Sequence, residues 1–331
     1  MKRLKSILVG TAVTLTTLVG GLALSTAALQ HKQFDAPTLK LHSSKDPQII
    51  ERGRYLAHGP AHCADCHTPA GERAAIEAGR QVPMSGGFEF HLPVGTFRTP
   101  NITPDVKTGI GRYTDPELAR MLRYGVRPDG TAMLPFMPFA NLSDEDLTAL
   151  ISFLRAQQPV EHAVRTQEPN ALGYVMKAFV VAPRGPTEPI RPQVTPEPTA
   201  AYGRYLAHSV ANCVGCHTKT DLRTGKVDGP LFGGGSALPS HINSSETFVP
   251  PNLTPDPRWG WINGWSESAF VARLRAGRVH QGSPMPWAAF QRMTEDDLRA
   301  IYRYLQSVPR AEGGPDPKDR NAVMIVSAVL N

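Results

Sequence analysis

The segments Cys63-Ala64-Asp65-Cys66-His67 and Cys213-Val214-Gly215-Cys216-His217 contain all 4 cysteines of this 331-residue chain. Both segments have the form Cys-x-x-Cys-His, and they lie 150 residues apart. The hexapeptide Gly53–His58 recurs without change as Gly203–His208 at the same offset. Every cysteine therefore belongs to a duplicated motif, and none is spare for a disulfide.

The duplication extends beyond the cysteines. Residues Pro100–Asp105 match Pro251–Asp256, and Ser143–Leu147 match Thr294–Leu298, both at an offset of 151 residues. A period this long, present in only two copies, indicates two homologous domains and not a solenoid.

A proline-rich segment separates the two copies. Residues 182–199 contain 6 prolines in 18 positions, which is typical of an extended linker of limited flexibility. We therefore predict a first domain at 45–181 and a second at 200–331, preceded by a targeting segment at 1–30.

The targeting segment is apolar after a basic start. Ile7–Leu29 runs for 23 residues without a charge and follows Lys2, Arg3 and Lys5. This pattern is typical of a secretory signal peptide or of an N-terminal membrane anchor, and both alternatives export the rest of the chain to the periplasm.

The net charge of the chain does not indicate a nucleic-acid partner. Lys2, Arg3 and Lys5 supply half of the net charge of +6, and no other Lys/Arg cluster of the kind that binds phosphates follows, which excludes nucleic acid as a partner.

Each domain is expected to be all-α, with about three main helices joined by loops. The 29 glycines and 31 prolines favour many loops, whereas a hydrophobic share of 41% excludes simple disorder. Start and stop signals mark one helix that begins at Asp46-Pro47 and two that end at a glycine, from Asp115-Pro116 to Gly125 and from Ser266 to Gly277. Two more helices follow Ser/Thr-x-x-Asp caps, at Leu147–Gln157 and Leu298–Ser307. Amphipathic tails follow at Asn170–Val181 and Asn321–Leu330, which could dock on their domain or lie at a membrane surface, and we expect docking.

The Cys-x-x-Cys-His spacing is the signature of covalent c-type haem attachment. Two thiols about one helical turn apart add to the two vinyl groups of one haem, and the adjacent histidine becomes an axial ligand of the iron. Two copies, each with its histidine, argue against a redox disulfide or half of a zinc site. The predicted residues for two haems c are Cys63, Cys66 and His67 in the first domain, and Cys213, Cys216 and His217 in the second.

A second axial ligand is expected to be a methionine, because a thioether is the soft donor that favours Fe(II). Met285 lies between two prolines, in Ser283-Pro284-Met285-Pro286-Trp287, nine residues before Thr294. Met137 has the same Met-Pro-aromatic context but lies six residues before Ser143, which a three-residue deletion explains. Met133 is the alternative, because it fits an alignment without that gap.

Other repeated polar residues leave two interpretations open. His58 and His208 could be alternative iron ligands, but their position near the end of the first helix is common for a cationic or capping histidine, and we do not expect them to bind iron. A repeated Asn-x-Thr could hydrogen-bond haem propionates or could belong to a turn set by the following proline. Its residues are Asn101, Thr103, Asn252 and Thr254.

These motifs resemble the class I cytochrome c domain. The tandem is most similar to the cytochrome c subunits and diheme cytochromes that serve bacterial membrane-bound alcohol, aldehyde or gluconate dehydrogenases, over roughly residues 45–180 and 195–331. The resemblance implies haem attachment at the two motifs and axial ligation by Met285 and Met137. It also implies a proline carbonyl that accepts the Nδ1 hydrogen of the axial histidine, which we assign to Pro83 and Pro230.

His/Met ligation at both irons would leave no open position for a substrate. We therefore expect outer-sphere electron transfer between a membrane-associated dehydrogenase and a respiratory acceptor, and no catalytic residue. One alternative is a diheme peroxidase, whose second iron needs a vacant distal position. Another is a dehydrogenase fused to haem domains, but neither half contains a Gly-rich nucleotide loop or a catalytic triad.

Overall fold

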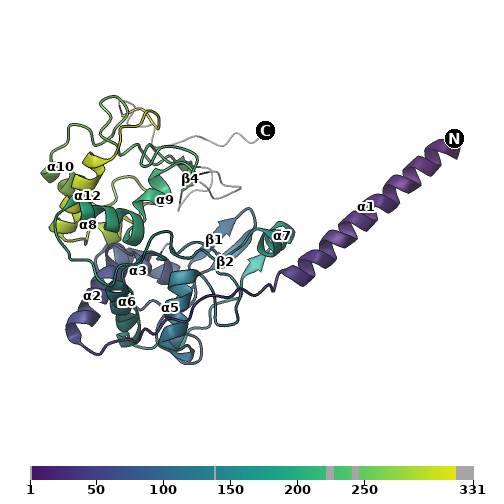
Figure 1. The fold of residues 1–331 in the computed structure, drawn as a ribbon, viewed down its shortest axis with the longest axis horizontal. Helices are drawn as coiled ribbons and strands as arrows, with labels where there is room; N and C mark the ends of the chain where they lie inside the picture. Colours follow the sequence, from purple (N-terminus) through teal and green to yellow (C-terminus); the bar gives the residue numbers. More distant parts are fainter. Residues whose placement is uncertain (1, 138, 221–226, 241–245, 318–331) are drawn as a thin grey trace.

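A computed structural model describes residues 2–137, 139–220, 227–240 and 246–317. Two helical lobes stack on each other, the lower one formed by the N-terminal half of the chain and the upper one by the C-terminal half (Figure 1). The long helix α1 (Lys2–Leu29) projects away from both lobes.

The N-terminal half is organised by three helices with side-chain caps. Asp46 caps α2 by accepting the Gln48 amide, with a proline at the first turn, and α5 ends at Gly125 in the left-handed conformation, both as predicted. Ser143 caps α6 through the Asp146 amide. The elements are α2 (Pro47–His58), α3 (Cys63–His67), η1 (Ala70–Glu72), α4 (Arg73–Glu77), β1 (Glu89–Leu92), β2 (Gly95–Arg98), η2 (Ile110–Arg112), α5 (Asp115–Tyr124), α6 (Asp144–Ala156), β3 (Glu168–Pro169) and α7 (Ala171–Phe179).

The C-terminal half repeats the main helices in the same order. Ser266 and Thr294 cap α10 and α12, in agreement with the predicted starts. The first helix of this half departs from its counterpart, because α8 continues into a π-helical turn, η3. The elements are α8 (Ala200–Tyr205), η3 (Leu206–Val210), α9 (Cys213–His217), β4 (Leu238–Pro239), β5 (Thr247–Phe248), α10 (Glu267–Arg275), α11 (Trp287–Phe290) and α12 (Glu295–Ser307).

Short strands correct the all-α prediction. β1 and β2 form an antiparallel hairpin, in which Phe90 lies opposite Phe97, and β3 pairs with β2. A two-stranded sheet, β4–β5, lies in the other half. The hairpin turns at Pro93 and Val94. Gly95 begins β2 with a φ of 128°, and a Cβ there would lie 2.3 Å from the Glu168 carbonyl oxygen, so only glycine fits. The fold is thus mainly helical with two small sheets in the loops.

In each half the helix that precedes the attachment motif crosses the helix that starts at the Ser/Thr cap, and a glycine lies at the crossing. α2 packs on α6 at Gly53, and α8 packs on α12 at Gly203. A Cβ at Gly53 would lie 1.9 Å from the Ala149 carbonyl oxygen, and a Cβ at Gly203 would lie 1.9 Å from that of Ala300. Only glycine therefore permits this close approach of the two backbones.

The two halves exchange tyrosine hydrogen bonds across a buried seam. The Tyr55 hydroxyl donates to Asp297 Oδ2 at 2.5 Å, and the Tyr205 hydroxyl donates to Asp146 Oδ2 at 2.8 Å. The two tyrosines occupy matching positions of the repeat, and the two aspartates are the third residues of α6 and α12. Arg52 adds an ion pair with Asp146 at 2.8 Å. Burial raises the pKa of both tyrosines, so the hydroxyls stay protonated and keep donating.

The proline-rich segment 182–199 is tied to both halves of the chain. The carbonyls of Arg191 and Pro192 accept the amides of Asp144 and Glu145 at the start of α6. Glu188 pairs with Arg204 at 3.0 Å. Residues 182–199 contain no helix or strand, and these contacts hold them against the rest of the chain.

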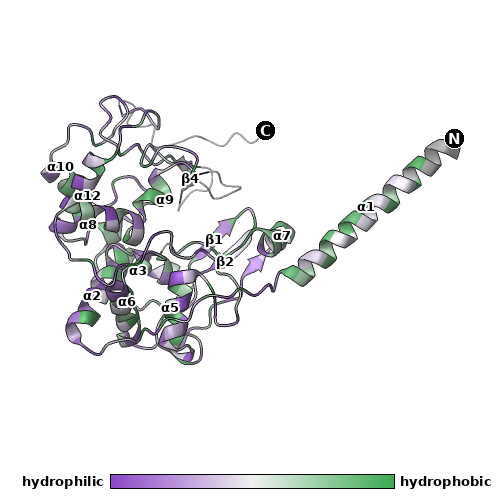
Figure 2. Cartoon of the chain, viewed as in Figure 1, coloured by the Kyte–Doolittle hydropathy of each residue, from purple (hydrophilic) through white to green (hydrophobic). Residues whose placement is uncertain are grey.

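The apolar helix and the first tail lie next to each other. Val9–Leu29 is long and apolar enough to cross a membrane, with a mean hydropathy of 1.7, and Figure 2 shows its apolar surface. Helix α7 docks against the α1 end and against the β2–β3 region, with Asn170 as its N-cap. Docking of this tail is thus confirmed, whereas the predicted tail Asn321–Leu330 lies outside the described residues.

Replacing Gly53 by Ala is expected to destabilise the fold. The new Cβ must displace the α6 backbone, and overpacking of this kind costs at least about 1–3 kcal/mol. Gly71→Ala is the matched control, because a Cβ there meets nothing within 4 Å. Urea unfolding of both variants measures the difference, and equal midpoints would contradict a tight crossing.

Candidate haem centres

The two Cys-x-x-Cys-His segments form one-turn helices that begin after a left-handed residue. His62 (φ 41°, ψ 33°) precedes α3, and Asn212 (φ 51°, ψ 35°) precedes α9. This sharp entry lets the short helix place the two cysteines one turn apart. All four cysteines are free thiols. Burial raises the pKa of Cys63 to about 12 and that of Cys66 to about 11, so these thiols are protonated at neutral pH.

Each motif histidine makes the same hydrogen bond. His67 Nδ1 lies 2.9 Å from the Pro100 carbonyl oxygen, and His217 Nδ1 lies 2.9 Å from that of Pro251. A carbonyl only accepts, so Nδ1 carries the proton and Nε2 keeps its lone pair. Burial also lowers the pKa of both imidazoles, which keeps them neutral. Two free thiols and a neutral imidazole with a free Nε2 are what a c-type haem requires, and both halves provide them.

The carbonyls that accept these hydrogen bonds are not the predicted ones. The Pro83 carbonyl accepts the Ser85 amide at 2.9 Å, and the Pro230 carbonyl accepts the Gly233 amide at 3.0 Å. The assignment to Pro83 and Pro230 was therefore wrong, because the carbonyls of both prolines accept hydrogen bonds within local turns. The correct prolines open the repeated Pro-Asn-x-Thr-Pro-Asp segment, and this repetition was the signal that could have identified them.

The Asn-x-Thr residues fix the loop that carries the accepting carbonyl. Asn101 Oδ1 accepts from the amide and the hydroxyl of Thr103 at 2.9 and 2.7 Å, and Asn252 does the same with Thr254. The Asn101 amide group donates to Val160 O at 2.8 Å, and that of Asn252 donates to Ala311 O at 2.7 Å. All four side chains are buried. Their polar groups are thus bonded within the loop and to the carbonyls of residues that follow α6 and α12.

A glycine that sequence reasoning missed closes each loop over its histidine. The Gly86 amide donates to the His67 carbonyl at 2.7 Å, and the Gly234 amide donates to the His217 carbonyl at 3.1 Å. Gly86 has a φ of 78°, and a Cβ there would lie 2.5 Å from the Pro100 carbonyl carbon. A side chain at this position would therefore push away the loop that orients the imidazole.

The methionine candidates differ in how they pack. Met137 and Met285 are half-buried, and both pack against the hydrophobic core. Met133 is not among the described residues that pack against it. The Met285 carbonyl accepts the Trp287 amide at 2.8 Å, and the Trp287 indole donates to Ser283 at 3.1 Å, which closes a compact turn over residues 283–287. In the first half Met137 precedes Pro138, which lies outside the described residues.

The repeated histidines His58 and His208 lie in helix packing. The His58 ring meets the edge of Phe153 on α6 at 5.6 Å, and His208 Nε2 lies 2.7 Å from the Tyr304 hydroxyl on α12. Burial lowers the pKa of His58 to about 4 and also lowers that of His208. Both are therefore neutral, which corrects the prediction of a cationic role at a helix end.

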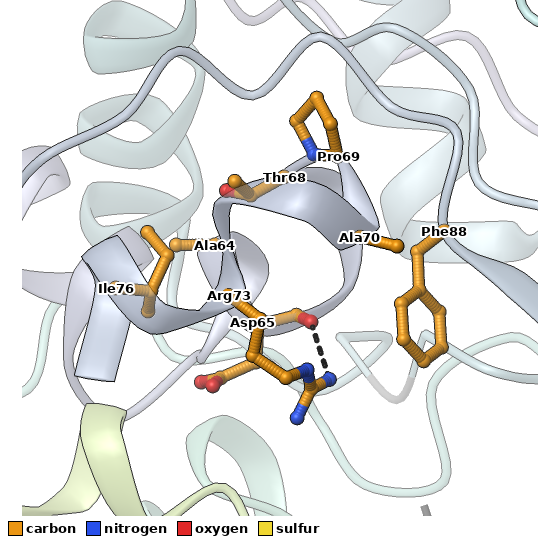
Figure 3. Close-up of a pocket in the computed structure, with 8 residues that line it drawn as sticks. All are labelled: Ala64, Asp65, Thr68, Pro69, Ala70, Arg73, Ile76 and Phe88. Atoms are coloured by element: carbon orange, nitrogen blue, oxygen red, sulfur yellow. Dashed lines mark hydrogen bonds between the residues drawn. The ribbon is translucent and has the colours of Figure 1, made fainter. Parts of the chain in front are cut away.

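A small recess lies against the first attachment helix (Figure 3). The space it encloses is about 10 Å³, room for about one water molecule. The Arg73 guanidinium crosses it and donates to the Asp65 carbonyl at 3.4 Å, while Phe88 lies on its other side. This recess is a packing gap beside α3, and it does not have the size of a haem site.

Comparison with known proteins gives the family. Residues 50–158 match the family model described as Cytochrome c. The chain is 31% identical over 290 residues to the alcohol dehydrogenase (quinone) cytochrome c subunit of Gluconobacter oxydans, covering 81% of this chain and 56% of that protein. It is 30% identical over 275 residues to the gluconate 2-dehydrogenase cytochrome c subunit of Pantoea cypripedii, covering 78% and 59%.

A third relative has a similar length to the matched region. The diheme cytochrome c-type protein of Cereibacter sphaeroides is 29% identical over 268 residues, which cover 76% of this chain and 83% of that protein. The chain belongs to the cytochrome c family and is related to dehydrogenase cytochrome c subunits. It spans little more than half the length of those subunits. Membership of this family implies covalently bound haem c.

Proposed function

We propose that this chain is a periplasmic diheme cytochrome c that carries electrons from a membrane-associated dehydrogenase to a respiratory acceptor. The observation that carries the proposal is the duplicated histidine geometry. In both halves the motif imidazole is oriented by a proline carbonyl at 2.9 Å, beside two free thiols. With a single haem, one of these two matched sites would bind no haem although it has the same geometry.

The proposed centres divide the chain into two cytochrome c domains, 45–181 and 200–331, joined by the linker 182–199. Haem c, when bound, supplies an iron that takes up and releases one electron. The chain's residues would hold it in a fixed, largely apolar setting, so that little reorganises when the charge changes. The ligands would be Cys63, Cys66, His67 and Met137 for the first haem, and Cys213, Cys216, His217 and Met285 for the second.

Electron transfer is favoured over peroxide reduction. Each half places a methionine that packs against its core, Met137 in one and Met285 in the other, so a thioether is available to close the sixth position of either iron. The relatives reported above are named as cytochrome subunits of dehydrogenases and as a diheme cytochrome. Neither observation favours an iron with an open distal position.

The periplasmic location is inferred from the first helix. Val9–Leu29 has the length and hydropathy of a membrane span and follows a basic start. Two alternatives remain within the proposal, a signal peptide that is cleaved and an anchor that keeps the haem domains at the inner membrane. Covalent haem attachment takes place after export in either case.

We expect two covalently bound haems per chain. The chain is expressed with a working haem maturation system, and haem content is measured from the pyridine haemochrome spectrum and by haem staining of denaturing gels. The variant Cys213→Ser/Cys216→Ser is the control and should retain one haem. A content of one haem in the unmodified chain would contradict the proposal for one of the halves.

Replacing Met285 by Ala is expected to lower the reduction potential of the second haem. Water or hydroxide would take the place of a soft thioether, which stabilises Fe(III) relative to Fe(II). Spectroelectrochemical titration and EPR of the ferric protein measure the change, and the first haem should keep its potential. If the spectra do not change, another residue binds this iron, and His280 is the nearest candidate along the chain.

Met137 and Met133 are distinguished by a pair of variants. Met137→Ala should abolish the thioether-to-ferric-iron absorption band of the first haem, because Met137 packs against the core. Met133→Leu should leave the band intact, because Met133 is not among the described residues that pack against that core. The opposite pattern would show that the gap-free alignment is correct and that Met133 is the ligand.

A further inference from the structure

The attachment helix of the first half touches the second half directly. Helix α3, which carries Cys63 and Cys66, is in contact with α11 of the other half. In Figure 1, α3 lies at the level where the two lobes meet. Helix α11 begins two residues after Met285, so this contact joins elements that belong to the two proposed haem centres.

His62 makes that contact. It directly precedes Cys63, and its ring meets the edge of Phe290 on α11, with centroids 5.9 Å apart and planes at 81°. The same imidazole also lies beside the backbone of Ala211, which lies two residues before Cys213. One side chain therefore touches both the approach to the second attachment motif and the helix that follows Met285.

The second half has an asparagine, Asn212, at the position of the repeat that matches His62. Asn212 has the same left-handed backbone and precedes Cys213, but its side chain stays within its own motif. A Cβ on Gly215 would lie 2.4 Å from Asn212 Nδ2, which shows how closely this amide covers α9. Asparagine satisfies the backbone at this position. The imidazole at position 62 is therefore not required by the turn, and it is the feature that crosses the seam.

One ion pair and one hydrogen bond also join the two halves near this contact. Arg278, on the segment that leads to Met285, pairs with Glu77 of α4 at 2.9 Å. Arg292, just after α11, donates to the Ile76 carbonyl. Both arginines belong to the C-terminal half, and both acceptors lie at the end of α4 in the N-terminal half. The two halves are thus also fastened to each other through α4, the second short helix after α3.

We propose that the His62 contact with Ala211 and Phe290 is the route by which an electron passes between the two haem centres, and that His62 is the positioning residue of this route. The proposal rests on the proposed function, because it needs a haem in each half. In the step, the ferrous iron of one half is oxidised to ferric while the ferric iron of the other half is reduced to ferrous. One electron moves, no bond changes and no proton is required.

The test replaces His62 by Asn, the residue that the repeat uses at the matching position. This change keeps a side chain suited to the left-handed backbone and removes the ring that crosses the seam. Flash photoreduction of the full haem-loaded chain, followed by relaxation between the two haems, gives an intramolecular rate that does not depend on protein concentration. We expect this rate to fall by about 10-fold, the lower end of what removal of a group next to a metal centre's ligands typically causes.

Reduction potentials and haem content separate a route from a general loosening. Both should stay unchanged in His62→Asn, and Phe290→Leu, which removes the other ring, should also slow the rate. Tyr55→Phe is the control, because it removes a hydrogen bond of the seam on α2, outside the attachment helix, and should leave the rate unchanged.

Two results would overturn the proposal. One is an unchanged relaxation rate in both His62→Asn and Phe290→Leu. The other is an equal loss of rate in Tyr55→Phe, which would assign the effect to the seam as a whole. A failure of the proposed function would look different, because the unmodified chain would then bind fewer than two haems or lack intramolecular relaxation altogether.

Discussion

The hydrogen bond between the motif imidazole and a proline carbonyl is the constraint on which each centre depends. It fixes the tautomer, because the proton must stay on Nδ1, and it leaves the Nε2 lone pair available to the iron that a haem would supply. The carbonyl can do this only if its loop is rigid, and the buried asparagine after each proline supplies that rigidity. In the first half Gly86, which closes the loop over the histidine, completes the arrangement, since a side chain there would displace the acceptor.

The seam between the halves makes two similar units into one core. Each half inserts a tyrosine hydroxyl onto a carboxylate at the start of the other half's last helix. Buried carboxylates without a partner are costly, so each half depends on the other for the satisfaction of one buried acceptor. The same seam brings α3 against α11, which is why the arrangement of the halves bears directly on electron transfer.

The two centres share a design and differ in their surroundings. His58 faces Phe153, whereas His208 hydrogen-bonds Tyr304 at the matching position. The residue before α3 is a histidine that crosses the seam, whereas the residue before α9 is an asparagine that covers its own motif. Polarity and hydrogen bonding around a haem set its reduction potential, so these differences would distinguish the two proposed centres.

The sequence by itself determined the local features of this protein. The repeat, the helix caps at Asp46, Ser143 and Thr294, the stop at Gly125 and the family could all be read from neighbouring residues. Such features depend on contacts a few positions apart, which leave a pattern in the chain.

Only the tertiary structure decided the rest. The acceptor of His67 lies 33 residues away, the Tyr55–Asp297 hydrogen bond joins residues 242 apart, and β2 pairs with a strand about 70 residues later. The repeated Pro-Asn-x-Thr-Pro-Asp segment marks the two accepting prolines as matching positions, but it does not say what their carbonyls face. A carbonyl or a tyrosine looks the same in the sequence whether it faces a histidine, a turn or another half. The neutral state of His58 likewise follows from burial between helices, which its place at a helix end does not reveal.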